Sequence, residues 1–499
     1  MSTDTTTLRD YQARVIEDAR LRWKDRPVLV APTGAGKTVI GGEIVRRAVA
    51  RGRRVLWLAH REELIQQAAQ RLARTGCPVA IIMAGHKEAR DLPVQVASIQ
   101  SLVRRTFPPA DVVIVDEAHH VRARTYRKVL DAYPQAAVLG LTATPFRSDG
   151  RGLGDVFGTI LVASTAADLV TAGHLLEPQF FAPYTPDTKG LRKRGGDWTG
   201  DDLGRLMDKP HLVGDVVKTW QQRAAGRRTV VFATTVQHSK NLVDAFLAAG
   251  VSAAHLDGET PKADRARVLA DLASGRLTVV SNCAVLTEGW DLPVLGCAIL
   301  ARPTASLGLH LQMVGRVMRP APGKADAVVL DHAGNVHRHG MPTDPIEYTL
   351  ADGVVRKESA KKPTKTCPGC FAVLAVKERT CPCCGWQFGR DLIPEQRGGD
   401  LGLVTRRGPA PLRPQASPGE RATEYARLLA EASARGYKAG FAGRRYLEVF
   451  GEWPRGPLYP LLVQAKAACQ HVKVEDGACR FCARQVAAPA PADTAAAPV

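Results

Sequence analysis

The sequence has no long hydrophobic run, and no apolar stretch approaches the roughly 20 residues that a membrane-spanning helix requires. Residues 1–9 are polar and lack the apolar stretch of a secretory signal. Cysteine is scarce over the first 350 residues, where Cys77, Cys283 and Cys297 stand far apart and are expected to be small core residues. We therefore expect a soluble, cytoplasmic protein that makes no membrane contact and has no disulfide framework.

Acidic residues are outnumbered, because 49 Asp and Glu stand against 68 Lys and Arg, a formal net charge of +19. Such an excess of cations favours a polyanionic partner, since each neutralised phosphate releases counterions. High arginine usage throughout a proteome would give the same balance, so the charge supports a nucleic acid partner without establishing one. The 45% hydrophobic fraction is that of a globular protein, and 499 residues suffice for about three domains.

Short β-rich apolar runs alternate with helical patterns over residues 7–340. Continuous apolar strands separated by helices are typical of parallel sheets that helices cover on both faces. The runs form two series, which predict two α/β domains with a boundary near residues 160–175. The first series is expected at 28–31, 55–59, 112–115 and 138–141, and the second at 229–233, 277–281, 298–301 and 327–331.

A glycine-rich turn joins the first predicted strand to a helical pattern, with the sequence Ala31-Pro-Thr-Gly-Ala-Gly-Lys-Thr38. Such a turn directs backbone N–H groups and the helix dipole at phosphate. Lys37 is expected to reach the β- and γ-phosphates of ATP and Thr38 to hold Mg²⁺. The general P-loop pattern begins with Gly, whereas this chain has Ala31. The residues of the turn that we expect to bind nucleotide are Pro32, Thr33, Gly34, Ala35, Gly36, Lys37 and Thr38.

A second motif, Asp116-Glu-Ala-His-His120, ends the strand predicted at 112–115. One carboxylate at a strand end can hold the Mg²⁺ and the next can orient the attacking water. We assign Asp116 to the metal and Glu117 to water activation. A solvated acidic turn is the alternative, and the P-loop argues against it. His119 and His120 are expected to pack or to couple domains and not to bind metal.

The series of motifs resembles that of the superfamily 2 DEAD/DEAH-box helicases, in the bacterial and phage group related to XPB-like helicases and type III restriction motor subunits. The resemblance covers about residues 8–340. It implies two tandem RecA-like domains that hydrolyse ATP between them. Gln12, in the segment Leu8-Arg-Asp-Tyr-Gln12, would bond the adenine base. Leu141-Thr-Ala-Thr-Pro145 resembles the motif that couples hydrolysis to domain movement.

The resemblance continues in the second half of the chain. Thr287-Glu-Gly-Trp-Asp291 matches a motif that meets nucleic acid and nucleotide, and Gly289 and Asp291 are expected on the nucleotide side. Gln312-Met-Val-Gly-Arg-Val-Met-Arg319 matches the arginine-finger motif. A guanidinium that reaches the γ-phosphate across a cleft makes hydrolysis depend on closure. Arg316 and Arg319 are the candidates, and Arg319 is expected to make the direct contact.

By the same resemblance, residues 59–63 and 96–100, with Thr234 and Thr287, would contact the sugar–phosphate backbone, which positions a protein without reading sequence. The basic run 192–194 is a further candidate, with a solvated loop as its alternative. We expect a helicase or translocase, with DNA favoured over RNA. The alternatives are a motor that moves on duplex DNA without separating strands and a non-catalytic nucleic-acid-binding scaffold.

Eight cysteines crowd between positions 367 and 482. Two Cys-x-x-Cys turns supply the four soft ligands that tetrahedral Zn²⁺ requires, and with no open position the site would be structural. The expected ligands are Cys367, Cys370, Cys381 and Cys384, with a swap of Cys383 for Cys384 as the alternative. Cys469, His471, Cys479 and Cys482 form a weaker candidate for a second site.

These patterns divide the chain into six parts. We expect a RecA-like ATP-binding domain over 1–165, a second RecA-like domain over 166–355, a zinc-ribbon-like module over 361–390, a flexible linker over 391–419, a small C-terminal module over 420–484 and a disordered tail over 485–499. In the C-terminal module, Tyr446, Phe450 and Trp453 are expected to form a small core. The C-terminal modules would also bind protein partners of a DNA-processing complex.

Overall fold

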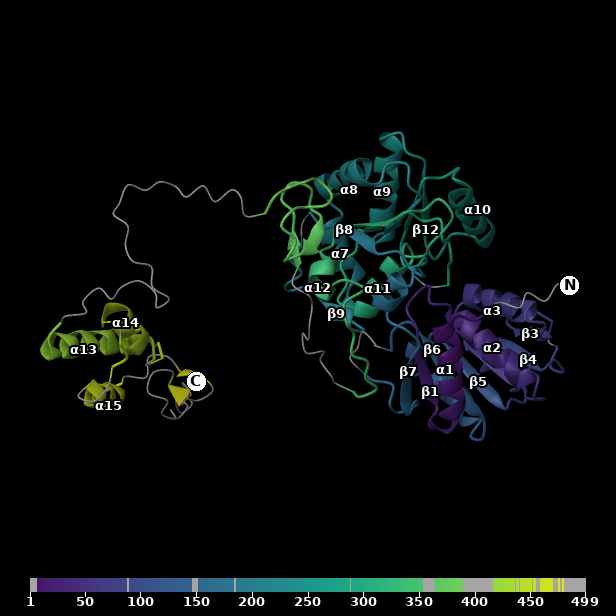
Figure 1. Ribbon diagram of the computed structural model, residues 1–499, viewed down its shortest axis with the longest axis horizontal. Coiled ribbons are helices and arrows are strands. Elements are labelled where there is room, and N and C mark those ends of the chain that lie inside the picture. The colour runs from purple at the N-terminus through teal and green to yellow at the C-terminus, as the bar shows by residue number, and fades with distance from the viewer. Residues whose placement is uncertain are drawn as a thin grey trace, which may run out of the picture. The chain divides into compact units, whose positions relative to one another are not determined.

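The computed structural model describes residues 7–352, 364–388, 416–469, 474–475 and 478–479, except for 88, 146–150, 184, 288, 436, 439, 451 and 455–457. None of the described helices has the length and hydropathy that a membrane span needs. The chain separates into two compact units, Met1–Leu392 and Ile393–Val499, and each is described by itself (Figure 1).

The first domain is built on a parallel sheet of seven described strands. All four strands predicted for this half of the chain lie in the sheet (Figure 1). In spatial order the strands are β3 (Val79–Ile82), β4 (Val94–Ser98), β2 (Val55–Ala59), β5 (Val112–Asp116), β6 (Ala137–Thr142), β1 (Pro27–Val30) and β7 (Thr159–Val162).

Helices cover both faces of this sheet, because every central strand is apolar on both sides. Leu29 and Ile114 face one layer of helices, whereas Val28 and Val113 face the other. The first layer consists of α1 (Asp10–Leu21), α2 (Lys37–Val49) and α3 (Glu62–Arg74). The second consists of α4 (Ile99–Leu102), η2 (Ala118–His120) and α5 (Arg124–Asp131), and a short helix η1 (Trp23–Asp25) precedes β1.

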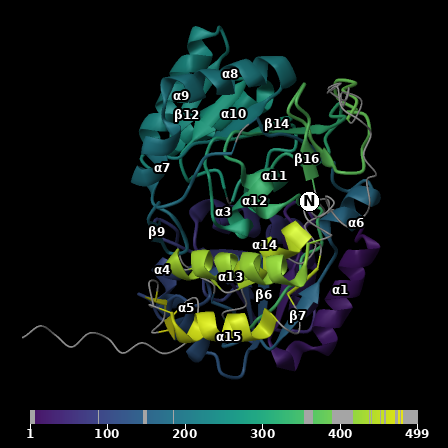
Figure 2. The same ribbon diagram turned by 90° about the vertical axis from the view of Figure 1, so that its left-hand side faces the viewer.

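The second domain has a parallel sheet of six described strands. The four strands predicted here are present, and the chain passes from the first sheet to the second between β7 and β8. Helices α8 and α9 lie side by side on one face (Figures 1 and 2). In spatial order the strands are β12 (Ala253–Leu256), β13 (Val279–Asn282), β11 (Thr229–Phe232), β14 (Cys297–Leu300), β15 (Ala327–Asp331) and β8 (Pro178–Phe181).

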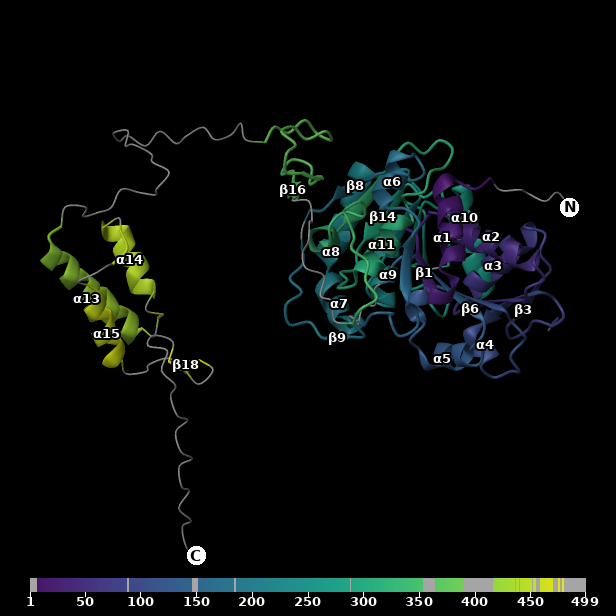
Figure 3. The same ribbon diagram turned by 60° about the horizontal axis from the view of Figure 1, so that its bottom comes forward.

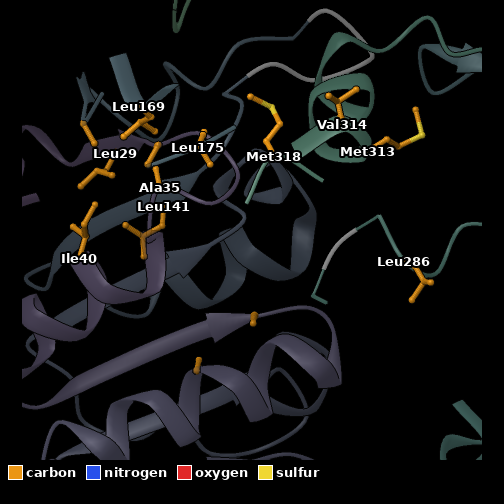
Figure 4. Close-up of a cluster of buried hydrophobic side chains, with 14 of the residues drawn as sticks. Leu29, Ala35, Ile40, Leu141, Leu169, Leu175, Leu286, Met313, Val314 and Met318 are labelled. Carbon is orange, nitrogen blue, oxygen red and sulfur yellow. The ribbon is translucent and has the colours of Figure 1, made fainter. Parts of the chain in front are cut away.

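The remaining elements of this domain are short helices and one hairpin. They are α6 (Ala166–Thr171), the hairpin β9 (Lys193–Arg194) and β10 (Asp197–Trp198), α7 (Gly200–Met207), α8 (Pro210–Arg223), α9 (Val236–Ala248), α10 (Lys262–Ser274), α11 (Leu307–Gly315) and α12 (Asn335–His339). Apolar side chains form a continuous cluster from the first domain into the second, in which Leu175 and Met318 lie between the P-loop and α11 (Figure 4).

The cysteine-rich module packs on the second domain. Its two strands, β16 (Thr364–Thr366) and β17 (Val373–Ala375), form an antiparallel pair. The backbone N–H of Ala182, at the end of β8, donates to the carbonyl of Phe371 at 3.0 Å, and Phe181 forms a β-bridge with Ala372. Because Cys367 belongs to the same buried cluster as Phe181, the module covers the edge of β8.

The C-terminal unit has its own small core. Its helices α13 (Pro418–Ala434), α14 (Gly440–Phe450) and α15 (Tyr459–Ala467) pack together (Figure 3). Helix α13 begins at Pro418, inside the segment predicted as linker, because Ser417 and Glu420 form a capping box there. Two further short strands, β18 (Val474–Glu475) and β19 (Ala478–Cys479), form a hairpin. Residues 391–415 of the linker predicted over 391–419, and the predicted tail over 485–499, lie outside the described residues.

The core predicted for this unit is correct for two of its three aromatic residues. Tyr446 and Phe450 are buried, with ring centroids 4.6 Å apart. Trp453 is 48% exposed, so its placement in the core was wrong. The physical reason is steric: the indole lies over Gly443, where it meets the surface of α14 and not the space between the helices.

Candidate active site between the two parallel sheets

One cavity of about 440 Å³ is lined by residues of both domains. It lies at the carboxyl end of β1, where the P-loop leads into α2. Thirteen of the fourteen residues predicted to bind or hydrolyse nucleotide line it, and Ala35 is the exception. The thirteen are Gln12, Pro32, Thr33, Gly34, Gly36, Lys37, Thr38, Asp116, Glu117, Gly289, Asp291, Arg316 and Arg319.

The P-loop adopts a conformation that its glycines make possible. Gly34 and Gly36 have φ angles of +92° and +82°, a region that side chains with a Cβ rarely occupy. At the first turn of α2, the Nζ of Lys37 donates to Oε1 of Glu117 at 2.8 Å. The loop therefore lines the cavity and holds its lysine against the acidic motif.

Helix α1 is joined to the same loop. The hydroxyl of Tyr11 donates to the carbonyl of Ala35 at 2.8 Å, and Nε2 of Gln12 donates to that carbonyl at 3.2 Å. The Oε1 of Gln12 accepts from the backbone N–H of Arg9. Ala35 itself is buried beneath the loop, so it contributes its carbonyl to this network and no surface to the cavity.

The acidic pair stands at the end of β5. Burial and the neighbouring Glu117 carboxylate raise the pKa of Asp116 to about 7, so a nearby cation would stabilise its ionised form. Glu117 occupies the left-handed region with a φ of +48°, an uncommon conformation for this residue type. That turn points both carboxylates into the cavity beside Lys37.

The histidines of the acidic motif connect it to neighbouring segments. The Nδ1 of His119 lies 3.2 Å from Oγ1 of Thr142, whose hydroxyl donates to the carbonyl of Thr144 at 2.8 Å. The ring of His120 lies tilted against that of His60, with 4.2 Å between the centroids. A shift of the acidic turn therefore reaches both the motif at 141–145 and the segment at 59–63.

The two arginines of the second domain stand in different surroundings. Arg316 is buried and donates to the backbone carbonyls of Thr287 and Trp290. Arg319 pairs with Asp291 and lies beside the P-loop, where a Cβ on Gly34 would be 3.2 Å from its Cγ. Burial lowers the pKa of Arg319 to about 10, which leaves it a cation at neutral pH.

Close backbone approaches join the domains at the base of the cavity. A Cβ on Gly315 would lie 2.5 Å from Cβ of Thr33 in the P-loop, closer than real Cβ atoms come. A Cβ on Gly308 would lie 3.1 Å from Oγ1 of Thr144. Glycine at position 315 therefore sets how closely α11 approaches the P-loop.

The segment 59–63, predicted to contact nucleic acid, joins the two domains a second time. Arg61 donates to the carbonyl of Val285 at 3.4 Å, and Arg265 of α10 pairs with Glu63 at 2.7 Å. Thr234 and Thr287 are nearly buried, and Oγ1 of Thr234 lies 2.8 Å from Nδ1 of His238.

The remaining candidates for nucleic acid contact lie in two different segments. Gln100, at the start of α4, donates to the carbonyl of His60 at 3.1 Å and so joins the segments 96–100 and 59–63. In the basic run 192–194, Arg192 is paired with Asp202 at 2.9 Å and the next two residues form β9.

Sequence reasoning missed several residues of the cavity wall. Arg9, Gln67 and Arg71 line it, and Nε2 of Gln67 donates to the carbonyl of Gly289 at 2.7 Å across the domains. Gln67 and Arg71 are four residues apart on α3 and therefore share one face of the helix. The polar residues at that spacing, opposite the buried Ile65 and Leu72, were the available signal.

The four predicted zinc ligands lie together in the cysteine-rich module. The Sγ atoms of Cys367, Cys370, Cys381 and Cys384 all lie within 4.8 Å of one another. Three of these residues are buried and Cys384 is exposed, while Cys383 stands outside the cluster. Four thiol ligands within this distance fit a tetrahedral Zn²⁺ site with no open position.

The second candidate site lies mostly outside the described residues. His471 and Cys482 are not described, and of Cys479 only the backbone is. Cys469 is buried in the core of the C-terminal unit.

Two family models match the chain. Residues 5–147 match "Type III restriction enzyme, res subunit" and residues 208–321 match "Helicase conserved C-terminal domain". A 51.5 kDa protein of a Lactococcus phage is 32% identical over 367 residues, which span 72% of this chain and 78% of the phage protein. The candidate mitochondrial ATP-dependent helicase irc3 of Schizosaccharomyces pombe is 30% identical over 359 residues, 68% of this chain and 59% of the yeast protein.

A solved structure shares the fold. The ATP-dependent type ISP restriction-modification enzyme LlaBIII bound to DNA superimposes with a TM-score of 0.51 at 21% identity. The match covers 66% of this chain and 28% of the restriction enzyme. The tandem parallel sheets, the order of the motifs and both family models agree with the predicted class. The chain belongs to superfamily 2 of the helicases, in the group related to restriction motor subunits and XPB-like helicases, and is an ATP-hydrolysing enzyme of that family.

Proposed function

We propose that this chain is an ATP-driven motor that moves on DNA and separates its strands. One observation carries the proposal: the P-loop and acidic motif of the first domain and the two arginines of the second line a single cavity. Hydrolysis in such a cavity depends on the distance between the domains, which lets nucleotide turnover drive their relative movement.

Each residue of the cavity has a proposed role. The P-loop N–H groups and Lys37 hold the β- and γ-phosphates, Gln12 reads the adenine base, and Gly289 and Asp291 close the nucleotide side of the second domain. Glu117 accepts a proton from the attacking water and orients it. Arg319 neutralises the charge that develops on the γ-phosphate, whereas Arg316 positions the loop at 287–290 through its carbonyls.

Mg²⁺ fits the donors between Thr38 and Asp116. A hydroxyl and a buried carboxylate are ligands that this ion prefers, and because burial and the Glu117 carboxylate raise the pKa of Asp116, a bound cation would favour its ionised form. When bound, Mg²⁺ would offset the negative charge of the phosphates. Zn²⁺ is proposed at the four-cysteine cluster, where it would be structural.

DNA is the proposed track in preference to RNA. The supporting observations are the match to a restriction enzyme subunit and the fold shared with a restriction-modification enzyme bound to DNA. The net charge of +19 suits either polymer. Protein partners of a DNA-processing complex, bound through the C-terminal modules, are part of the proposal. A duplex translocase that leaves the strands paired is the alternative.

The test is ATP hydrolysis with no polymer and with single-stranded, duplex, forked and RNA substrates, followed by strand displacement on forked and blunt duplexes. Stimulation by DNA with displacement of a forked strand is expected, and the matched Glu117→Gln variant should bind ATP without turning it over. Stimulation by RNA alone would contradict the choice of track. Stimulation without displacement would favour the duplex translocase.

A further inference from the structure

The segment 341–352, which we call the strap, leaves the second domain and crosses to the first. It starts after α12, where the carbonyl of Gly340 lies 3.3 Å from Nε2 of the buried His310. It ends at Asp352, which contacts the first domain. The strap contains no described helix or strand, so its contacts must come from its side chains and isolated backbone groups.

The strap begins with a turn, in which the backbone N–H of Asp344 donates to the carbonyl of Met341 at 3.1 Å, and then continues without a described helix or strand. In its middle, the exposed residues 345 and 347 alternate with the half-buried Ile346 and Tyr348, which is the two-residue period of an extended chain. The strap residues that contact the body of the protein, here called inward, are Pro342, Asp344, Ile346, Tyr348, Leu350 and Asp352, of which Asp352 is itself exposed.

The first half of the strap runs along the seam between the domains. Four of its inward residues, from Pro342 to Tyr348, line a small cavity of about 50 Å³. The other walls of this cavity are Thr33 of the P-loop, Thr144 of the coupling motif and Gly315 of α11. The strap therefore lies against the groups that change position when the two domains approach one another.

The end of the strap is held by the first domain. The backbone N–H of Gly154 donates to the carbonyl of Leu350 at 2.9 Å, and that of Gly152 donates to Oδ1 of Asp352 at 2.7 Å. Any side chain at Gly152 would collide with the Leu350 carbonyl. Arg122, two residues beyond the acidic motif, donates to the same Asp352 oxygen at 3.1 Å.

Beyond the strap the chain returns to the second domain. It is next described at Thr364, where the cysteine-rich module begins, and that module is fixed to β8 by the Ala182–Phe371 hydrogen bond and a shared core. The described residues on either side of the strap in the sequence are therefore both fixed to the second domain. Its contact with the first domain lies between these two anchors.

We propose that the strap couples the two domains, that Leu350 and Asp352 are positioning residues for the segment after the acidic motif, and that the metal-bound cysteine module is the clasp that keeps the strap in place. The last part rests on the zinc site proposed above. In this proposal the cysteine-rich module acts within the chain: it holds the strap, and the strap contacts Arg122, two residues after the acidic motif.

The test measures amide hydrogen exchange at Gly152 and Gly154 in the full chain, because both amides donate to the strap. Exchange is expected to rise roughly tenfold in the Leu350→Ala/Asp352→Ala double variant, since the protecting acceptors are lost or loosened. The same rise is expected when a chelator removes zinc from the unaltered chain, with the amides of α3 unchanged. Glu347→Ala, on the outward face, is the matched control and should leave exchange as it is.

Kinetics distinguish positioning from general stability. The double variant should lower the DNA-stimulated kcat for ATP roughly tenfold with little change in KM, since misplacement of a catalytic segment acts on the reacting state. The single variant Asp352→Asn keeps an acceptor oxygen at this position and should therefore retain most of the rate of the unaltered chain. Unchanged exchange and unchanged kcat in the double variant would overturn the strap proposal.

The effect of zinc removal tests the cysteine-rich module independently of the double variant. Unchanged exchange at Gly152 and Gly154 after zinc removal would overturn the clasp even where the double variant behaves as expected. Absence of zinc from the purified chain would overturn the proposed metal site, and the double variant would still decide the role of the strap.

Discussion

At the scale of single residues, the candidate site depends on how closely two backbones approach. Gly315 ends α11 directly against Thr33 of the P-loop, and there is no room for a methyl group between them. A side chain at this position would hold the domains apart by acting on the loop that binds phosphate. Because Gly315 has no Cβ, α11 can lie against the P-loop at the distance that we expect hydrolysis to require.

Gly315→Ala is therefore expected to lower the DNA-stimulated kcat by about tenfold or more, because the P-loop and α11 must separate to admit the Cβ. Steady-state ATP hydrolysis measures this. The matched control is Gly214→Ala on α8, where no atom lies within 4 Å of the added Cβ. That change should leave kcat unchanged and raise helix stability by roughly 0.5–1 kcal/mol. Equal kinetics of the two variants would contradict the steric argument.

Substitution of the two arginines of the second domain should have different effects. Arg319→Ala should retain ATP binding and lose hydrolysis by about a thousandfold, the range found for arginine fingers. Arg316→Ala should lower the melting temperature in addition to the rate of hydrolysis, because it leaves the buried carbonyls of Thr287 and Trp290 without their donor. Nucleotide-binding titrations and thermal unfolding of both variants are the measurements. Loss of ATP binding alone in Arg319→Ala would refute the assignment.

At the scale of elements, the sequence predicted those that are long and strongly apolar. Most central strands are apolar on both faces, so their composition identifies them, although the interior strand β4 was not among those predicted. The strands at the edges of the sheets, β3, β7, β8 and β12, were also missed, and Pro-Gln-Phe-Phe and Ala-Ala-His-Leu of the second sheet carry little apolar signal. Their pairing comes from the neighbouring strand and, for β8, from the cysteine module that covers its edge.

The candidate site was predictable where a local motif defines it and not where distant segments meet. Lys37 and Asp116 were found from their motifs, and both line the cavity. Arg71 was missed because its cavity is formed only when the domains come together. The contact of Asp352 with Gly152 joins residues 200 positions apart, and no local pattern encodes that distance.

The cysteine module yields a prediction about stability. Cys370 lies in the buried cluster that includes Phe181, so loss of the proposed zinc should expose that core and free the edge of β8. Cys370→Ser is expected to lower the melting temperature by several degrees, corresponding to about 2–3 kcal/mol. Cys383→Ser is the matched control, because this exposed cysteine stands outside the cluster and should leave the melting temperature unchanged. Equal effects of both substitutions would mean that Cys370 binds no metal.

At the scale of the whole molecule, three buried histidines make stability depend on pH. Burial lowers the pKa of His238 to about 4, of His332 to about 4 and of His310 to about 3, and all three lie in the second domain. Each is neutral in the folded chain. Since an unfolded histidine titrates near 6.5, the unfolded state binds more protons below that pH.

Stability should therefore be full above about pH 6.5 and fall as the pH drops toward 4, by roughly 1.4 kcal/mol per pH unit for each of the three histidines. Thermal unfolding between pH 7 and pH 5 measures this slope. His332→Gln, which cannot take up the proton, should show a shallower slope, whereas His86→Gln at an exposed position should match the unaltered chain. A slope unaffected by His332→Gln would contradict the assignment.

The alternating part of the strap also limits how the length of the chain can change. From 345 to 348, exposed positions alternate with Ile346 and Tyr348, which line the cavity at the seam. Inserting or deleting one residue between these two would turn Tyr348 toward solvent, because an extended chain alternates with a period of two. Two residues added together would preserve the faces. Among relatives that keep this strap, length differences between these two positions should be even numbers.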